Sequence, residues 1–407
     1  MENKKKKKSK WMKFRHKVVI RLLKLILTPI VKFKYGMTIE KCDYIKKNQV
    51  LVISNHQTSF DQFFMSLVAY PRHLYYIASE DLFSKGLVSK LIKYLVAPIP
   101  FKKSTSDLSA VMNCMRVVRE GGSIGLFPEG NRTYDGKLTY VKPSIANLVK
   151  ALRIPVAIMK IEGGYGVEPR WAGKTRKGKM RAYVSKIIEP SEYKDMSNEE
   201  LYNIISNELD VDEAKVTGEF KSKKSAEFLE RVIYVCPKCG LSEFHSHKDT
   251  ITCKKCNLTV RHLPTKELVG ISDSIPFKFV SDWYEYQNSF INDMSLDLYK
   301  DTPIYTDKIQ FKEVIACKKH IVIFKKAYAS LFGDRTVVTY KDKEETLPFD
   351  KTHAMTVLGK NKLNIYIQDK IFQFKADKRF NALKYMNIFY RFKDIKREDN
   401  NGRFLGL

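Results

Sequence analysis

Residues 50–61 read V-L-V-I-S-N-H-Q-T-S-F-D, and residues 123–133 read S-I-G-L-F-P-E-G-N-R-T. Each stretch begins with a short apolar run, which is typical of a strand buried inside a sheet. In both stretches polar residues follow the apolar run at once, so a loop must follow each strand. Open α/β sheets bind their ligands at the carboxyl ends of such strands. The two stretches therefore predict an α/β domain with chemistry at that edge of its sheet.

The first loop carries a histidine and an aspartate five positions apart, His56 and Asp61. Thr58 or Ser59 is a suitable N-cap for a helix that starts near Phe60, which would place the aspartate in the first helical turn. A carboxylate on one ring nitrogen fixes the histidine tautomer and leaves the other nitrogen as a base near neutral pH. The alternative is a turn histidine and a helix-start aspartate that are unrelated, because this spacing alone is common.

The second loop combines a carboxylate, a glycine and a guanidinium. Arg132 offers a planar fork that suits phosphate or carboxylate, and Gly130 lets a ligand approach the backbone closely. An apolar helical repeat between residues 108 and 118, stopped by two glycines, precedes this strand. Taken by itself, the second loop is also compatible with an ordinary turn at the end of a strand.

In this order, the two motifs resemble those of the glycerolipid acyltransferase family, whose best known members make phosphatidic acid from lysophosphatidic acid. That family carries N-H-x4-D, a basic block, F-P-E-G-T-R and an apolar V-P-V-x-P block. This chain has counterparts at residues 55–61, 97–103, 127–132 and 154–159, and the resemblance covers residues 17–190. Three residues depart from the family pattern: Lys103 replaces arginine, Asn131 threonine and Ile158 proline. Lysine keeps the charge but lacks the bidentate fork, which bears on how the acceptor's phosphate is held.

The resemblance implies a mechanism. His56 is the general base that takes a proton from the acceptor hydroxyl, and Asp61 orients it. The hydroxyl attacks an acyl thioester directly, with acyl-CoA or acyl carrier protein as co-substrate and no catalytic cofactor. The acceptor is lysophosphatidic acid and the product is phosphatidic acid. The implied substrate-binding residues are Asn55, Lys103, Glu129, Gly130 and Arg132, of which Asn55 also positions the turn.

The chain is strongly basic, with a net charge of +28 and a pI near 9.6, which suits anionic lipid or nucleic acid as partner. Its apolar stretch at residues 18–31 is too short to span a bilayer. Basic residues fall on one side of a helix there, namely Lys17, Arg21 and Lys24, and the predicted apolar set lies away from that side: Val19, Ile20, Leu23 and Leu27. This pattern predicts an interfacial helix on anionic lipid. We therefore expect a peripheral or monotopic protein on the cytoplasmic face of a membrane. The alternative is an ordinary surface helix with a basic tail.

Four cysteines form two C-x2-C knuckles separated by 13 residues, at Cys236, Cys239, Cys253 and Cys256. Four thiolates in this arrangement predict a closed, structural zinc site. Two disulfides are the alternative, and they are rare in a reducing compartment. The other cysteines have no partner spacing and are expected to be buried thiols: Cys42, Cys114 and Cys317.

The chain divides into five predicted segments. They are a basic membrane-contact segment, an α/β acyltransferase domain with a mainly β central sheet and flanking helices, a linker, a small zinc ribbon and a β-rich C-terminal accessory domain. Their residue ranges are 1–35, 36–215, 216–231, 232–262 and 263–407.

Alternation of apolar and polar residues predicts antiparallel strands in the last segment. Leu363, Ile365 and Ile367 alternate with polar residues, and Phe372 and Phe374 follow after a short turn. Strands closed by one helix near residues 382–390 resemble a pleckstrin-homology-like module, and a plain accessory domain is the alternative.

Three other functions compete with lysophosphatidic acid acylation. A close variant acylates another lysolipid or another hydroxyl acceptor. A basic zinc-ribbon protein that binds nucleic acid explains the charge and the cysteines, but it does not explain the ordered motifs. A degenerate acyltransferase fold could serve as a lipid-binding scaffold, and the complete set His56, Asp61, Glu129 and Arg132 argues against it. We expect no nucleic-acid partner.

Overall fold

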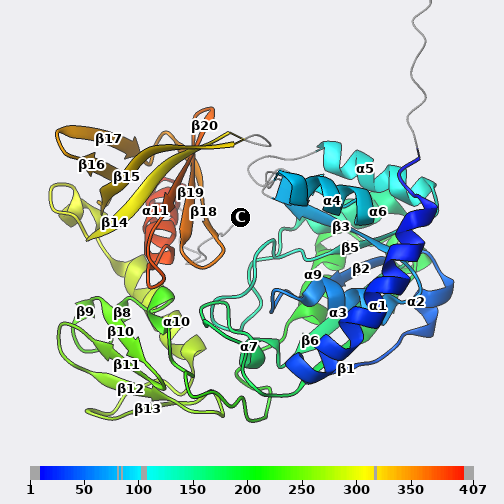
Figure 1. Cartoon of the computed structure of the whole chain (residues 1–407), viewed down its shortest axis with the longest axis horizontal. Helices are drawn as coiled ribbons and strands as arrows, with labels where there is room; N and C mark the ends of the chain where they lie inside the picture. The colour runs from blue at the N-terminus through cyan, green and yellow to red at the C-terminus, as the bar shows by residue number, and fades with distance from the viewer. Residues whose placement is uncertain (1–9, 80–81, 84–85, 102–107, 316–318, 398–407) are drawn as a thin grey trace, which may run out of the picture.

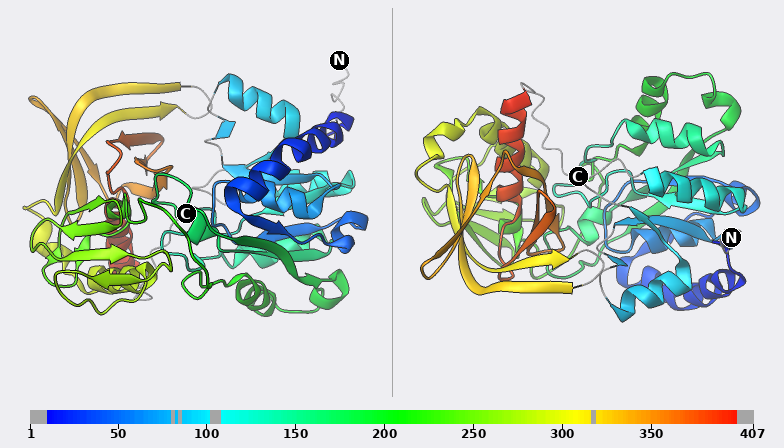
Figure 2. Two further views of the ribbon diagram at one scale, coloured as in Figure 1. Left: turned by 60° about the horizontal axis from the view of Figure 1, so that its bottom comes forward. Right: turned by 90° about the horizontal axis from the view of Figure 1, so that it is seen from above.

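A computed structural model describes residues 10–79, 82–83, 86–101, 108–315 and 319–397 (Figure 1). Lys103 and Cys317 lie outside these described residues. A helix-flanked sheet forms one half of the molecule and β-rich structure forms the other, and two further views show the halves side by side (Figure 2). The predicted fold class, α/β followed by a β-rich C-terminal region, is therefore confirmed.

The first half is built on a seven-stranded sheet of order β1-β7-β6-β2-β5-β3-β4. All its strand pairs are parallel except β6 with β7. Its strands are β1 (Met37–Ile39), β2 (Leu51–Ser54), β3 (Leu74–Ser79), β4 (Ile99–Phe101), β5 (Ser123–Leu126), β6 (Val156–Glu162) and β7 (Met180–Ile188). Its helices are α1 (Phe14–Tyr35), α2 (Asp43–Lys47), α3 (Asp61–Ala69), α4 (Leu87–Val96), α5 (Leu108–Arg119), α6 (Ser144–Leu152), α7 (Gly164–Val167), α8 (Pro190–Tyr193) and α9 (Asn198–Leu209).

Strand β2 lies near the middle of this sheet, and apolar residues cover both of its faces. Successive side chains of a strand point to opposite faces. Accordingly Leu51 and Ile53 pack with α5, α6 and α9, whereas Val50 and Val52 pack with α1 and α3. Burial on both sides explains why this stretch is a continuous apolar run and not an alternating one. It also fixes the loop that follows β2 at the sheet edge.

Two local expectations need correction. Helix α3 begins at Asp61 with Phe60 as its N-cap residue, and neither Thr58 nor Ser59 is the N-cap. Helix α5 forms where the apolar repeat predicted it, but it buries Ala110, Cys114 and Val117. Two residues of the predicted repeat, at positions 108 and 112, are exposed instead, because the sheet contacts a neighbouring face of the same helix.

The cysteine knuckles lie in a small region of short strands. A two-stranded sheet holds β8 (Val235–Cys236) and β9 (Gly240–Leu241), and a four-stranded antiparallel sheet holds β10 (Phe244–His247), β11 (Thr250–Cys253), β12 (Thr259–His262) and β13 (Leu268–Gly270). The 3-10 helix η2 (Leu229–Arg231) precedes this region, and α10 (Val280–Asp293) and η3 (Leu296–Tyr299) follow it.

The C-terminal region is a seven-stranded antiparallel sheet of order β17-β16-β15-β14-β20-β19-β18. Its strands are β14 (Tyr305–Ile315), β15 (Lys319–Leu331), β16 (Arg335–Tyr340), β17 (Lys343–Pro348), β18 (Thr352–Leu358), β19 (Lys362–Ile367) and β20 (Lys370–Lys375). Helix α11 (Leu383–Arg397) follows. The hairpin of β19 and β20 pairs Ile365 with Phe372 and Leu363 with Phe374, as the alternation predicted.

The two halves are packed together and not merely tethered. Tyr165 and Trp171, which follow β6, are buried in the same apolar cluster as the cysteine knuckles and the C-terminal sheet. Phe220 and Leu229, inside the segment predicted as a linker, are also buried. Part of the predicted linker is therefore packed into the folded structure. The division of the chain into five segments stays a prediction.

Candidate active site

The His56 and Asp61 side chains meet where β2 ends. His56 Nδ1 lies 2.7 Å from Asp61 Oδ2. The imidazole is stacked on the Phe127 ring, with 4.5 Å between ring centroids, and 21% of the histidine side chain is exposed. Because Asp61 occupies the Nδ1 side, Nε2 is the nitrogen left for proton transfer. The arrangement is that of a tautomer-fixed base next to solvent.

Asp61 is completely buried and holds the loop as well as the imidazole. Its Oδ2 accepts the backbone N–H groups of Gln57 at 2.6 Å and Thr58 at 2.8 Å, and its Oδ1 accepts the Thr58 hydroxyl at 2.6 Å. A buried carboxylate needs such donors in place of water. The same bonds explain how a first-turn carboxylate reaches back to a loop histidine.

Glu129 fastens the second loop to the first. Its Oε1 accepts the backbone N–H of His56 at 2.5 Å, and its Oε2 accepts the backbone N–H and the hydroxyl of Thr139 at 3.0 and 2.7 Å. Burial raises the pKa of Glu129 to about 7, against the lowering effect of these donors. Both oxygens are thus engaged by the protein, so Glu129 positions His56. It was predicted to hold the acceptor.

Asn55 is buried and bound to the end of β6. Its Nδ2 donates to the carbonyl of Ile161, and its Oδ1 accepts the Ile161 N–H, both at 2.8 Å. The amide thereby pairs with a backbone unit as a strand residue would. Asn55 consequently positions the turn, since the Ile161 backbone engages both ends of its amide.

Glu168 connects Arg132 to the loop that carries His56. Arg132 Nη1 is 3.1 Å from Glu168 Oε1, which also accepts the Ser59 hydroxyl at 2.7 Å. The other Glu168 oxygen accepts the Tyr35 hydroxyl at 2.9 Å. Arg132 is mostly buried and keeps further N–H donors, so it can bind an anion while Glu168 holds its orientation.

Gly130 has a positive φ of 67°, and its backbone N–H donates to the carbonyl of Phe127 at 3.1 Å. This closes the tight turn that the sequence predicted between β5 and Arg132. The structure therefore brings together five of the predicted site residues: His56, Asp61, Glu129, Gly130 and Arg132. Asn55 holds the histidine loop to the end of β6. Lys103, the predicted second anion contact, lies outside the described residues.

Sequence reasoning missed Tyr35, Ser59 and Glu168. Tyr35 ends α1 and Glu168 follows α7, so neither belongs to a motif that can be read locally. Ser59 was considered only as a helix cap. The sequence shows Glu168 only as a single glutamate after an apolar Tyr-Gly-Val run. Nothing in that pattern indicates that Glu168 contacts Arg132.

The four cysteine sulfurs converge as the zinc prediction requires, and they all lie within 4.8 Å of one another. The Cys236 and Cys256 sulfurs are 3.5 Å apart, and those of Cys239 and Cys253 are 3.6 Å apart. A disulfide needs about 2.05 Å, so the alternative of two disulfides does not fit. Four sulfurs at about 2.3 Å from one ion would be roughly 3.8 Å apart, which matches.

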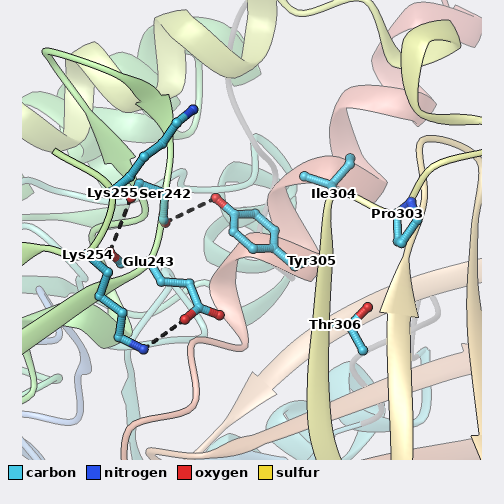
Figure 3. A pocket seen from close by; sticks show the side chains of 8 residues that line it. All are labelled: Ser242, Glu243, Lys254, Lys255, Pro303, Ile304, Tyr305 and Thr306. Carbon is cyan, nitrogen blue, oxygen red and sulfur yellow. Dashed lines mark hydrogen bonds and ion pairs between the residues drawn. The ribbon is translucent and has the colours of Figure 1, made fainter.

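A separate hollow lies between the knuckle strands and β14 (Figure 3), with a volume of about 430 Å³. Lys254 and Glu243 on its wall form an ion pair of 2.8 Å, and the Tyr305 hydroxyl donates to the Ser242 carbonyl at 3.3 Å. These contacts join the knuckle region to the C-terminal sheet. The hollow contains neither His56 nor Arg132 among its lining residues and is not part of the active site.

Residues 36–161 match the sequence profile of the family described as Acyltransferase. The chloroplastic 1-acyl-sn-glycerol-3-phosphate acyltransferase BAT2 of Brassica napus is 24% identical over 161 residues, which cover 39% of this chain and 46% of that protein. The 1-acyl-sn-glycerol-3-phosphate acyltransferase of Bacillus subtilis is 22% identical over 176 residues, covering 43% of this chain and 84% of that protein.

Among solved structures, the 1-acyl-sn-glycerophosphate (LPA) acyltransferase from Thermotoga maritima is similar to this chain, with a TM-score of 0.39 and 23% identity. The similarity covers 48% of this chain and 76% of that one. The chain spans about half the length of the plant relatives it matches, 46% and 47% for two of them.

The His56–Asp61 pair at the end of β2 and the Arg132 turn after β5 both lie inside the matched segment. Residues 36–161 match the Acyltransferase family, and the names of the relatives bear out the resemblance to glycerolipid acyltransferases. The profile match ends before the cysteine knuckles and the C-terminal sheet.

Proposed function

We propose that this protein transfers an acyl chain from an acyl thioester to the free hydroxyl of lysophosphatidic acid and so makes phosphatidic acid. The observation that carries the proposal is the buried Asp61 carboxylate at 2.7 Å from His56 Nδ1, with Arg132 on the adjoining turn. The first two groups supply a base, and the third supplies an anion contact for a phosphate. The similarity to 1-acyl-sn-glycerol-3-phosphate acyltransferases supports this acceptor.

In the proposed reaction His56 Nε2 removes the proton of the acceptor hydroxyl as its oxygen attacks the thioester carbonyl carbon. Collapse of the tetrahedral intermediate breaks the carbon–sulfur bond, and the proton on the imidazole neutralises the leaving thiolate. The balance is one ester formed and one thiol released. Coenzyme A and acyl carrier protein both fit as the carrier of the thioester.

We propose further that the α1 side of the domain rests on a membrane surface. One face of α1 exposes an apolar row that continues over most of its length, formed by Phe14, Val18, Leu22, Leu25, Ile26 and Phe33. We call this row the apolar stripe. It differs from the predicted apolar set, of which Ile20 and Leu27 are buried against the domain. Basic residues flank the stripe, which suits anionic lipid.

Helix α4 extends this surface. It exposes Leu87, Val88, Leu91 and Tyr94, and Arg15 of α1 donates to the Tyr94 carbonyl at 2.8 Å. An exposed apolar area of this kind usually marks an interaction site. Among the described residues, no helix combines the length and the apolar character needed to cross a bilayer. Binding at the interface is therefore the form of membrane contact we propose.

Zinc is the structural metal we propose for the four cysteines. Cys236, Cys239, Cys253 and Cys256 would hold it and join β8 to the β11–β12 hairpin. The metal would supply folding energy to this region and take no part in acyl transfer.

The deciding experiment measures thiol release from an acyl-CoA, with and without lysophosphatidic acid, for the wild type and His56→Ala. Release that requires both the acceptor and His56 supports the proposal. Release without the acceptor points to a thioesterase. If neither acyl-CoA nor acyl carrier protein thioesters are consumed with lysophosphatidic acid or other lysolipids, the scaffold or nucleic-acid alternatives take its place.

A further inference from the structure

We propose that the turn between β18 and β19 of the C-terminal sheet forms part of the acceptor site, and that Lys360 in this turn binds the acceptor's phosphate together with Arg132. This inference rests on the proposed function for the identity of the acceptor. It assigns a substrate-binding task to a region that lies outside the family match. Strands β18 and β19 lie on the side of the C-terminal sheet that is turned toward the α/β domain (Figure 1).

A buried arginine connects this turn to the arginine of the active site. Arg170 Nη1 donates to the carbonyl of Arg132 at 2.8 Å, and Arg170 Nη2 donates to the carbonyl of Val357 in β18 at 2.9 Å. The guanidinium lies 4.0 Å above the ring of Tyr134. One rigid, buried fork therefore holds the backbone of the active-site turn and the backbone of β18 at a fixed separation.

Lys360 reaches from this turn to the loop that carries Glu168. Its Nζ donates to the carbonyl of Ala172 at 2.6 Å and lies 3.5 Å from the carbonyl of Gly173. These carbonyls fix the position of the ammonium group, Lys360 as a whole residue is exposed, and a third N–H donor of the ammonium is left for a ligand. A lysine anchored by backbone carbonyls is pre-organised for an anion and loses little side-chain freedom on binding it.

The charges around Lys360 also suit an anion. Burial of part of the side chain lowers the pKa of Lys360, and the positive charges of Arg231 and Arg132 lower it further, whereas Glu168 raises it. Two guanidinium groups near one ammonium repel each other unless negative charge lies between them. Glu168 is already paired with Arg132. A phosphate monoester would supply the additional negative charge that this cluster lacks.

The test is equilibrium binding of a short-chain lysophosphatidic acid to the full-length protein by calorimetry, without a donor. The variants are Lys360→Gln, Lys360→Arg and the matched control Lys351→Gln, an exposed lysine at the opposite end of β18. We expect Lys360→Gln to weaken binding about tenfold, because a hydrogen-bonded charge is lost. Lys360→Arg should stay within about threefold of the wild type, and the control should be unchanged.

Further ligands separate the possible sources of the phosphate. Binding of acyl-CoA and of a neutral monoacylglycerol should be equal in Lys360→Gln and the wild type. Unchanged affinity for lysophosphatidic acid in Lys360→Gln overturns the inference alone, and so does a loss confined to acyl-CoA. An equal loss for the neutral lipid reveals a purely structural lysine and overturns it too. Absence of lysophosphatidic acid binding in the wild type instead removes the proposed acceptor, and this inference with it.

Discussion

The hydroxyl of Tyr35, in the last turn of α1, donates to Glu168 Oε2 at 2.9 Å, while Glu168 Oε1 lies 3.1 Å from Arg132. A helix that exposes an apolar stripe to its surroundings is thus linked to the proposed phosphate contact by a single carboxylate. Burial and the negative charge of Glu168 raise the pKa of Tyr35 well above its usual value, so the hydroxyl remains a donor at all physiological pH values.

Tyr35→Phe removes this hydrogen bond and keeps the ring. Glu168 then loses a donor that holds it against Arg132, so we expect KM for lysophosphatidic acid to rise about three- to tenfold with little change in kcat. Steady-state acylation kinetics measure both constants. Tyr44→Phe is the matched control, since Tyr44 bonds to Glu189 and contacts none of these residues. A drop in kcat at constant KM would contradict the proposed link.

Asp61→Asn should reduce kcat about 10² to 10⁴-fold, the usual contribution of a well-oriented general base. An amide oxygen can take the place of Oδ2, but it carries no negative charge, so it accepts more weakly from His56 Nδ1 and does not stabilise the imidazolium that forms during the reaction. His56→Ala should be inactive, whereas His245→Ala, which removes an exposed histidine of β10, should be unaffected.

The thermal unfolding midpoints of these variants distinguish a loss of catalysis from a loss of folded protein. His56→Ala should melt close to the wild type because the buried Asp61 carboxylate keeps its bonds to the Gln57 and Thr58 N–H groups and to the Thr58 hydroxyl. Turnover by a folded His56→Ala protein would disprove the assignment of the base.

The sequence made the His56–Asp61 pair predictable because both residues belong to one loop and one helical turn. The β19–β20 hairpin was predictable because Leu363, Ile365 and Ile367 follow a two-residue period, and the same period resumes at Phe372 after a short turn. In both cases the spacing along the chain determines the local geometry, so the sequence alone is enough to predict it.

No local sequence pattern predicted the contact between Tyr35 and Glu168. Their contact depends on how α1 and the segment after α7 lie across the sheet, which is a property of the packed fold. The buried face of α5 was missed for a related reason. Its sequence contains two apolar rows, and only the position of the sheet decides that Cys114 and Val117 point inward.

Removal of the metal should loosen the knuckle region first. Trp283 of α10 donates to the carbonyl of Val235, and Gln287 accepts the N–H groups of Tyr234 and Val235. Loss of the four-sulfur site therefore also frees the contacts of α10. We expect one zinc per chain by elemental analysis, and faster proteolysis near residues 235–262 after chelation or in Cys253→Ser. Cys114→Ser, which alters a thiol far from the site, should keep the metal.

Glu129 should make stability depend on pH. Its folded pKa is about 7, against 4.5 for the free side chain. Because the folded pKa is raised, the stabilisation is complete below about pH 4.5 and is lost as the pH rises through about 7. The free energy of unfolding of the wild type, relative to Glu129→Gln, should fall by up to about 3 kcal/mol between these limits.

Urea titrations at about pH 5.5 and pH 8 measure this difference. Comparing two proteins that differ only at position 129 cancels the effect of Glu213, whose pKa burial also raises to about 7. A difference that stays constant with pH would mean that Glu129 is ionised throughout this range.

The apolar stripe should carry membrane binding. Leu25 and Phe33 are 72% and 82% exposed, and burying each in lipid is worth about 1.5 to 3 kcal/mol. Leu25→Glu with Phe33→Glu should therefore reduce flotation with phosphatidylglycerol vesicles at least tenfold. Leu298→Glu is the matched control, because Leu298 is 75% exposed on η3, outside the α/β domain. If the control loses flotation equally, or if the double variant floats as well as the wild type, the stripe is not the membrane contact. High salt alone should weaken binding only in part, since the basic residues add about 1 kcal/mol each and the apolar burial is insensitive to screening.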